Sequence, residues 1–543
     1  MNANDLIAQI LKQEGVEQMT CFPNNPLIEA AAQQGIRPIM FRHERGAIMA
    51  ADGFSRMSDG KRFGVVATQN AAGAENSVGG LAQAFADNVP ILVLPGGYPL
   101  DQRQVRPNFW ALENYRGVVK MVESIDTPDQ VPDVMRRAFQ ALRNGPGGPV
   151  VVELTSDVCA REVSDDLQPY HSPGTAQQVP AHSEIEKAVT ALLDAEQPMI
   201  WAGWGVLMSG ATASLQALAE LTGIPVFTTM EGKSAFDERH PLSLGAGSGA
   251  TTGPAHRWIV ESDCVLGLGT SFSHNGYCQR VPAGKTVIHN TIATDDINKE
   301  TPSDIALLGD AGLTIDAMIE EVKARTGGKA RETGVAAAIA DARQNWLADW
   351  SGLLESDEEP LNTYRVIHEI DTNIDHENSV ITHDAGAPRD SMVPFFTATT
   401  PHSYIGWGKT THLGFGIPLL IGAKLADPSR FCLNLMGDGA FGMSGLDLET
   451  SVREELPITT VILDNGGMAT YPGGFPTARK QFNFSQMTGN YATIAEGLGA
   501  TGLTVTKTAE MGPAIQEARR LNAAGTTVLI NVHSNFEAKK SRF

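Results

Sequence analysis

The chain has 543 residues, a formal net charge of −21 and a sequence pI near 5.0. An acidic chain in which no basic cluster stands out is not expected to bind nucleic acid or an anionic membrane surface. Its five scattered cysteines form no CxxC pair, which argues against a zinc site or a disulfide framework and indicates a reducing compartment such as the cytoplasm.

The N-terminus is expected to begin with a helix rather than a signal peptide. Residues 1–15 place apolar side chains on one face and mix acidic residues among them. The sequence holds no apolar run of about 18 residues, so no membrane span is expected. The length fits about three domains of ordinary size.

Residues 1–165 alternate short apolar strands with amphipathic helices, and they are expected to form the first domain. Strand-like runs recur at residues 63–68, 91–94 and 150–154. Alternation of this kind predicts an α/β fold with a doubly wound parallel sheet.

Two polar turns follow strands of this first domain. In one of them, His43 and Glu44 precede a helix of small residues, so Glu44 could lie buried against a ligand. A helix-start glutamate stabilised by the helix dipole explains the same residues. The other turn, residues 68–73, contains Gln69 and could be a plain capping turn. The residues alone leave both alternatives open.

A second α/β segment is expected at residues 184–325, after a linker that contains proline, serine and glutamine. Its Gly203-Trp204-Gly205 turn is a weak dinucleotide-binding signal, and a tight turn is the favoured interpretation. The charged, helical residues 326–360 are expected to connect this second domain to a third.

Residues 360–543 return to the α/β pattern and bring polar side chains to two strand ends. An apolar run at 431–436 ends in Gly437-Asp438-Gly439, and a run at 458–463 is followed by Asn465 and two glycines. Open parallel sheets bind ligands at the carboxyl edge of their strands. An Asp, an Asn and a main-chain carbonyl are hard oxygen ligands that suit Mg²⁺. An ordinary Gly-Asp turn is the alternative.

These motifs together resemble one enzyme family. Asn465 follows Asp438 by 27 positions, which is similar to the GDG…NN fingerprint of thiamine diphosphate (ThDP) enzymes, with Asp464 in place of the first Asn. Residues 42–56 and 71–97 resemble the pyrimidine-binding domain of the acetolactate synthase and benzoylformate decarboxylase-like ThDP enzymes. The resemblance covers nearly the whole chain and implies three doubly wound domains: pyrimidine-binding, central Rossmann-like and diphosphate-binding.

The resemblance also implies how the aminopyrimidine ring would be held. Glu44 would bond its N1′ atom and favour the imino tautomer, whose N4′ atom takes the proton from thiazolium C2. The main-chain carbonyl of Thr411 would receive the 4′-amino group. Leu413, which stands where the family has Met, would keep the cofactor bent.

The diphosphate end is implied to be held through a metal ion. By the resemblance, Mg²⁺ would be bound by the side chains of Asp438 and Asn465 and by the carbonyl of Gly467. The other residues implied to contact the cofactor are Gly386, Gly437, Gly439, Ala440 and Phe441.

The resemblance places Gln69 and His43 beside the reacting carbon as further catalytic candidates. Gln69 stands where a benzoylformate decarboxylase-like relative has a catalytic histidine, and an amide cannot shuttle protons near neutral pH. The loop at residues 468–475 lacks the Arg/Trp pattern of true acetolactate synthases, and residues 106–115 replace their Phe-Gln-Glu element. Tyr471 and other residues of that loop could form an aromatic lid.

The central domain resembles the one that carries FAD in acetolactate synthases. Residues 271–274 and 292–294 depart from the arginine-bearing and acidic segments of those relatives. FAD is therefore not expected here.

The expected function is that of a ThDP- and Mg²⁺-dependent lyase or carboligase that acts on a 2-oxo acid or related α-carbonyl substrate through an enamine. A 2-oxo acid decarboxylase that releases an aldehyde and a non-catalytic cofactor-binding paralogue are the alternatives. The first and third domains follow one plan of glycines, helices and strands, as in this family. The resemblance implies a homodimer or homotetramer with active sites at the subunit interface.

Overall fold

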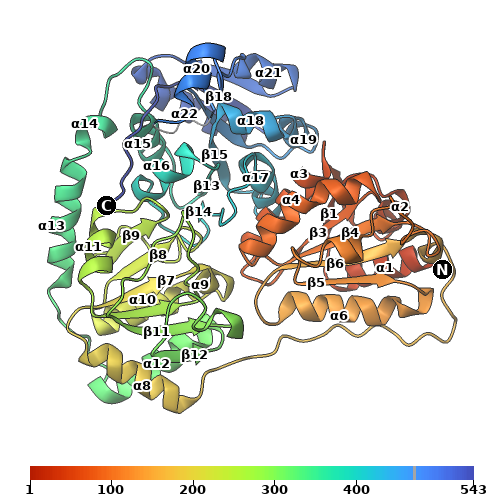
Figure 1. Cartoon of the computed structure of the whole chain (residues 1–543), viewed down its shortest axis with the longest axis horizontal. Coiled ribbons are helices and arrows are strands. Elements are labelled where there is room, and N and C mark those ends of the chain that lie inside the picture. Colours follow the sequence, from red (N-terminus) through yellow and green to blue (C-terminus); the bar gives the residue numbers. More distant parts are fainter. Residues whose placement is uncertain (469–472) are drawn as a thin grey trace. The chain divides into compact units, whose positions relative to one another are not determined.

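The computed structural model describes residues 1–468 and 473–543. These residues fall into two compact units, and each unit is described here by itself (Figure 1). The N-terminal unit comprises Met1–Ala176, Thr410–Pro428 and Ser444–Leu456, and the C-terminal unit comprises Gln177–Lys409, Ser429–Met443 and Pro457–Phe543. One six-stranded parallel sheet in the first unit and two in the second confirm the predicted α/β fold.

The N-terminal unit is built on a parallel sheet with the strand order β2-β1-β3-β4-β6-β5. Its central strands are buried along nearly their whole length, as expected where helices cover both faces of a parallel sheet. The strands are β1 (Gln18–Cys21), β2 (Arg37–Met40), β3 (Gly64–Thr68), β4 (Ile91–Gly97), β5 (Met121–Ile125) and β6 (Pro149–Thr155).

Helices cover both faces of this sheet. Apolar side chains of α1 and α6 pack with those of the strands in one core cluster, and Figure 1 shows α3 and α4 over the opposite face. The helices are α1 (Ala3–Gln13), α2 (Asn25–Gln33), α3 (Glu44–Arg56), α4 (Ala72–Ala86), α5 (Ala111–Asn114), η1 (Pro128–Gln130), α6 (Val131–Arg143), α7 (Ser156–Cys159), α17 (Gly416–Ala426) and α19 (Asp447–Arg453).

Helices α3 and α17 lie in direct backbone contact although they are far apart in the sequence. A Cβ atom on Gly53 would collide with the carbonyl oxygen of Leu419, and one on Gly422 would collide with the carbonyl oxygen of Ala50. The small residues of α3 thus serve helix–helix packing. Residues 416–426, predicted from the sequence to lie in the third domain, pack against α3 as part of the N-terminal unit.

Alanine at Gly53 or Gly422 is expected to lower the free energy of unfolding by about 3 kcal/mol or more, because the added methyl group must push two helix backbones apart. Thermal unfolding of each variant measures this loss. Gly497→Ala is the matched control, because a Cβ atom there would meet no atom within 4 Å. An unchanged unfolding midpoint in Gly53→Ala would contradict the close packing.

The central sheet of the C-terminal unit has the order β12-β11-β10-β7-β8-β9, which is the doubly wound arrangement of nucleotide-binding folds. Its strands are β7 (Pro198–Ala202), β8 (Val226–Thr229), β9 (Ser243–Gly247), β10 (Cys264–Leu268), β11 (Thr286–Thr291) and β12 (Ile305–Leu308). The helices of this part are α8 (His182–Asp194), α9 (Trp204–Met208), α10 (Thr212–Thr222), α11 (Gly253–Glu261), η2 (Thr294–Asp296), α12 (Ala311–Thr326), α13 (Val335–Ala348) and α14 (Ser351–Leu354).

The other sheet of the C-terminal unit has the order β14-β13-β15-β16-β18-β17. Taken in chain order, its strands are arranged as in the N-terminal sheet, which supports the common plan of the two halves. The strands are β13 (Ser379–His383), β14 (Tyr404–Ile405), β15 (Phe431–Gly437), β16 (Thr459–Asp464), β17 (Thr501–Val505) and β18 (Val528–His533). The helices are α15 (Thr363–Asn373), α16 (Ala387–Phe395), α18 (Asp438–Ser444), α20 (Pro476–Phe482), α21 (Tyr491–Gly497) and α22 (Thr508–Ala523).

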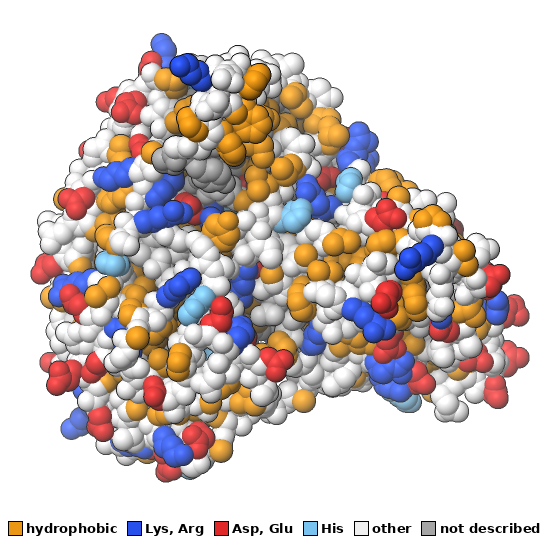
Figure 2. All heavy atoms as spheres, viewed as in Figure 1, with side chains coloured by type: hydrophobic (Ala, Val, Ile, Leu, Met, Phe, Trp, Pro, Cys, Tyr) orange, Lys and Arg blue, Asp and Glu red, His pale blue; other side chains and the backbone are white. Residues whose placement is uncertain are grey.

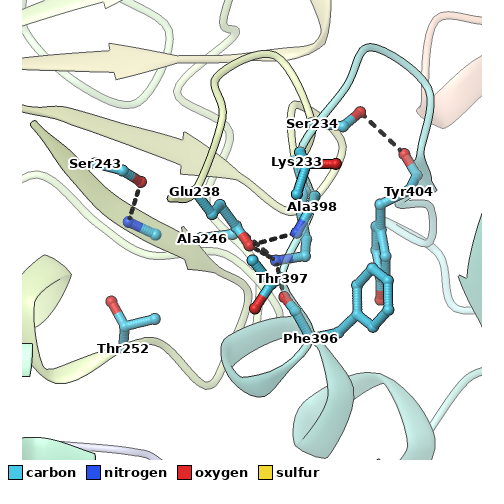
Figure 3. Close-up of polar contacts among 12 residues, drawn as sticks. Lys233, Ser234, Glu238, Ser243, Ala246, Thr252, Phe396, Thr397, Ala398 and Tyr404 are labelled. Carbon is cyan, nitrogen blue, oxygen red and sulfur yellow. Dashed lines mark hydrogen bonds and ion pairs between the residues drawn. The ribbon is translucent and has the colours of Figure 1, made fainter. Parts of the chain in front are cut away.

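A buried ion pair joins the two sheets of the C-terminal unit (Figure 3). The Lys233 ammonium group contacts both carboxylate oxygens of Glu238, at 2.5 and 2.6 Å, and donates to the carbonyl of Phe396 at 2.7 Å. Glu238 in turn accepts a hydrogen bond from the main-chain N–H of Ala398. Each charged group of the pair is thus bonded both to the other and to a main-chain group. Removing either side chain would leave a buried charge uncompensated.

Acidic and basic side chains are interspersed on the face drawn in Figure 2. Among the described residues, no helix is both long enough and apolar enough to cross a membrane.

Candidate functional site

The N-terminal sheet brings two predicted catalytic residues to one edge. Glu44 begins the helix that follows β2, and Gln69 follows the last residue of β3. These strands flank β1, where the strand order reverses, and ligands bind at such a reversal in open α/β sheets. His43 is exposed and caps α3, since its Nδ1 atom accepts the main-chain N–H of Arg45 at 3.2 Å.

Glu44 is a buried carboxylate, with 3% of its surface exposed. Its Oε2 atom accepts a hydrogen bond from Nδ2 of Asn76 at 3.1 Å. Its Oε1 atom faces Gly73, where a Cβ atom would lie 3.0 Å from that oxygen and 2.8 Å from Cβ of Gln69. Glycine at position 73 therefore leaves room beside both candidate residues.

Asp447 of α19 supports the first turn of the helix that carries Glu44. Its carboxylate packs so closely against Gly46 that a Cβ atom there would collide with Oδ2, and Oδ1 accepts the main-chain N–H of Arg42 at 3.4 Å. Burial raises the pKa of Asp447 to about 7. Only a glycine at position 46 admits this contact.

The loop predicted to hold the pyrimidine ring lies in the same unit. Thr411 has a φ angle of +53°, a left-handed conformation that is unusual for a β-branched residue. Thr411 and Leu413 are both half-buried. Nδ1 of His412 lies 3.5 Å from a guanidinium nitrogen of Arg45, which follows Glu44 in the sequence. The loop and the start of α3 are thus neighbours within the N-terminal unit.

The diphosphate-binding candidates gather at the reversal point of the last sheet, between β13 and β15. Gly386 precedes α16 with a φ angle of +85°, which favours glycine. Asp438 is the first residue of α18 and directly follows β15, and Asn465 directly follows the adjacent β16. The Oδ1 atom of Asn465 accepts the main-chain N–H of Gly467 at 3.2 Å.

The surroundings of Asp438 suit a divalent cation. The residue is 3% exposed, and its Oδ1 atom accepts the main-chain N–H of Gly439 at 2.7 Å, while its buried Oδ2 atom has no hydrogen-bond partner. Burial raises the pKa of Asp438 to about 6, with the negative charge of Asp464 adding to this effect and the main-chain N–H groups of Gly439, Gly466 and Gly467 opposing it. A buried carboxylate oxygen without a partner, close to a second carboxylate, fits the oxygen-rich shell that Mg²⁺ prefers.

The remaining cofactor candidates are packed around this turn. Ala440 and Phe441 are buried, and the Phe441 ring packs edge-on against Tyr491 with 5.4 Å between centroids. A Cβ atom on Gly439 would lie 3.0 Å from Cγ of Met468, so the side chain of Met468, after β16, packs closely against the turn. Gly437 ends β15 directly before Asp438.

The loop that could form an aromatic lid, with simple packing as the favoured role of its aromatic residues, is described only in part. Tyr471 lies outside the described residues. Phe475 is 46% exposed and packs edge-on against Phe484 with 5.1 Å between centroids.

In the central part of the C-terminal unit, the Gly203-Trp204-Gly205 turn packs against backbone. A Cβ atom on Gly203 would lie 2.5 Å from the carbonyl oxygen of Gly269, and one on Gly205 would lie 2.7 Å from Cα of Gly269. Both glycines are needed for this packing, which favours the tight-turn interpretation.

Sequence reasoning missed three polar residues near the pyrimidine-binding candidates: Asn76, Gln83 and Asp447. Asn76 and Gln83 lie seven positions apart on α4, a spacing that places them on one helix face. That periodicity was the available signal, although it does not reveal their partners. No local pattern indicates the contact between Asp447 and Gly46, which are separated by most of the chain.

Models of three protein-family domains match the chain. Residues 1–125 match the N-terminal TPP binding domain of thiamine pyrophosphate enzymes, residues 185–318 match the central domain, and residues 384–532 match the C-terminal TPP binding domain. Thiamine pyrophosphate is another name for ThDP.

The chain is also similar to several proteins over most of their length. It is 30% identical to a probable acetolactate synthase large subunit of Methanococcus aeolicus, over 95% of this chain and 90% of that protein. It is 31% identical to the corresponding protein of Methanocaldococcus jannaschii, over 86% and 80%. It is 28% identical to a glyoxylate carboligase of Escherichia coli O157:H7, over 96% and 91%.

Proposed function

The chain belongs to the thiamine pyrophosphate enzyme family, among relatives of the acetolactate synthase large subunit, and from that premise we propose that it is a carboligase or lyase acting on 2-oxo acids. The proposal includes Mg²⁺ as the metal that binds the cofactor. The observation that carries the proposed function is the buried carboxylate of Glu44. It is hydrogen-bonded to Asn76 on one side and faces Gly73 on the other.

ThDP, when bound, supplies a carbanion at thiazolium C2 that adds to a carbonyl carbon. The residues of this chain would orient it and control its protons. Glu44 would bond the N1′ atom of the aminopyrimidine ring and so hold a proton at that atom. Thr411 would accept the 4′-amino group through its main-chain carbonyl, and Leu413 would pack against the cofactor.

Asp438, Asn465 and the carbonyl of Gly467 would hold Mg²⁺ against the diphosphate. The support for this assignment is the unpartnered Oδ2 atom of Asp438 and the nearby carboxylate of Asp464. The N-terminal turn of α18 and Gly386 would add main-chain contacts to the diphosphate. We propose that FAD is not required, because the backbone of Gly269 packs directly against Gly203 and Gly205 in the turn that gave the dinucleotide-binding signal.

A carboligase is favoured over a simple decarboxylase by the residue at position 69. Gln69 is exposed next to Glu44 and Gly73, where it could hydrogen-bond a substrate carbonyl but could not deliver a proton near neutral pH. The names of the relatives, acetolactate synthase and glyoxylate carboligase, point to the same class. A non-catalytic paralogue is disfavoured because Glu44, Asp438 and Asn465 are all present.

Incubation with pyruvate, glyoxylate and larger 2-oxo acids, in the presence of ThDP and Mg²⁺, tests the function. We expect CO₂ release accompanied by a ketol that joins two substrate units. Aldehydes alone would favour the decarboxylase alternative. Binding of ThDP without turnover of any 2-oxo acid would favour the paralogue.

The assembly and location form the last part of the proposal. We propose a homodimer or homotetramer with active sites at the subunit interface, which light scattering would test. The five cysteines form no disulfide with one another, which supports a reducing, cytoplasmic location.

A further inference from the structure

One face of α4 contacts Glu44 and the loop that carries Thr411, which are predicted to bind the aminopyrimidine ring. Asn76, Gly79, Gln83 and Asp87 recur at intervals of three or four positions, which places them along one side of the helix and its C-terminal cap. Asn76 binds Glu44. The ring of His412 packs against Gly79, where a Cβ atom would collide with it.

Gln83 binds the loop on both sides of Thr411. Its side chain is fully buried. Its Oε1 atom accepts one hydrogen bond from the Thr410 hydroxyl at 2.7 Å and another from the main-chain N–H of His412 at 3.3 Å. The two flanking residues of Thr411 are thus tied to a single atom on α4.

The amide of Gln83 is held in this orientation by a buried charged cluster. Its Nε2 atom donates to Oδ2 of Asp87 at 2.8 Å, and the same oxygen accepts from Arg56 at 2.8 Å. Arg56 also contacts Asp52 at 2.5 Å, and all three charged residues are buried. A carboxylate accepts hydrogen bonds but donates none, so Gln83 must turn its nitrogen toward Asp87 and its oxygen toward the loop.

Thr411 needs such support because its backbone conformation is unfavourable. A left-handed φ angle on a β-branched residue is strained and persists only where the surroundings impose it. The hydrogen bonds from Thr410 and His412 to Gln83 hold the residues on either side of Thr411. In this conformation the main-chain carbonyl of Thr411 is the group proposed to receive the 4′-amino group.

We infer that Gln83 is a positioning residue, which holds the Thr411 carbonyl in register with Glu44 through the rigid helix α4. This inference rests on the proposed function, since it assigns the geometry of the aminopyrimidine site to one helix. Asn76 fixes the acid that would bond N1′, and Gln83, seven positions later, fixes the carbonyl that would bond the 4′-amino group. The Asp87–Arg56–Asp52 cluster fixes Gln83.

Gln83→Met tests the inference, because methionine keeps the volume of the side chain and removes its hydrogen bonds. Gln18→Met is the matched control. Gln18 is also a glutamine that bonds the 410–428 segment, through the carbonyl of Leu425 at 3.2 Å, but it does so away from Thr411. Thr410→Val is a milder variant that removes one hydrogen bond at an exposed residue.

Three measurements separate positioning from mere stability. They are the thermal unfolding midpoint, ThDP affinity by calorimetry with Mg²⁺, and the near-ultraviolet circular dichroism band of the imino tautomer of bound ThDP. We expect Gln83→Met to lose the imino band and to lower kcat on a productive 2-oxo acid about 10- to 100-fold with little change in KM. Thr410→Val should show a smaller effect of the same kind, and Gln18→Met should keep the band and kcat.

The inference is overturned if Gln83→Met retains the imino band, or if its kcat falls no further than that of Gln18→Met at equal loss of thermal stability. Should Gln83→Met fail to fold, an unchanged band and kcat in Thr410→Val would overturn it as well. A wild-type protein that binds no ThDP would overturn the proposed function together with this inference, whereas normal wild-type binding with an unaffected Gln83→Met would overturn the inference alone.

Discussion

Replacing Glu44 with glutamine is expected to lower turnover by about 1,000-fold or more while leaving ThDP bound. The amide has the size of the carboxyl group and can still accept the hydrogen bond from Asn76, so the site should keep its shape. It cannot exchange a proton with N1′ of the ring, which removes the route to the imino tautomer. Turnover of a productive 2-oxo acid and calorimetric titration with ThDP measure the two effects separately.

Glu75→Gln is the control for this experiment, because it makes the same chemical change at an exposed position on α4. It should leave both turnover and affinity unchanged. Turnover of Glu44→Gln close to that of the wild type would refute the role assigned to Glu44. A simultaneous loss of ThDP binding would instead show that the carboxylate serves mainly to bind the cofactor.

Replacing Asp438 with asparagine is expected to weaken ThDP binding in the presence of Mg²⁺ by about 100-fold or more, since it removes the charge of a metal ligand. The protein without cofactor should be at least as stable as the wild type. The change removes a buried carboxylate that lacks a partner on Oδ2 and is repelled by Asp464. Calorimetry and thermal unfolding, each with and without ThDP and Mg²⁺, measure both effects.

Asp310→Asn is the matched control for Asp438→Asn. Asp310 also stands between a strand and a helix of the C-terminal unit, where it caps α12 by accepting the main-chain N–H of Leu313 at 3.0 Å. Its replacement should not alter ThDP affinity. Equal affinity of Asp438→Asn and wild type for ThDP and Mg²⁺ would exclude Asp438 as the metal ligand.

Local sequence patterns were sufficient to predict the fold class and the strand ends. Asp438 and Asn465 follow apolar runs of strand length, and parallel strands bring such positions to one sheet edge whatever the details of packing. The residues around Glu44 left two alternatives open, and its predicted role came from the resemblance of residues 42–56 to the pyrimidine-binding domain.

The partners of these residues could not be predicted because they come from distant parts of the chain. Gln83 bonds Thr410 and His412, more than 300 positions away, and its helical spacing from Asn76 on α4 does not reveal these partners. Gly46 looks like any small helical residue until Asp447 is seen against it. The division of the molecule likewise departs from sequence order, since α17 and α19 pack with the N-terminal residues.

The backbone contact between α3 and α17 has a consequence for synthesis of the protein. Translation delivers the first 176 residues long before it delivers α17, so a nascent chain carries the glycine- and alanine-rich side of α3 without its cover. Exposed apolar surface on a folding intermediate promotes aggregation, and cells commonly shield it with chaperones. The ribosome must therefore have completed most of the polypeptide before its earliest-made portion can finish folding.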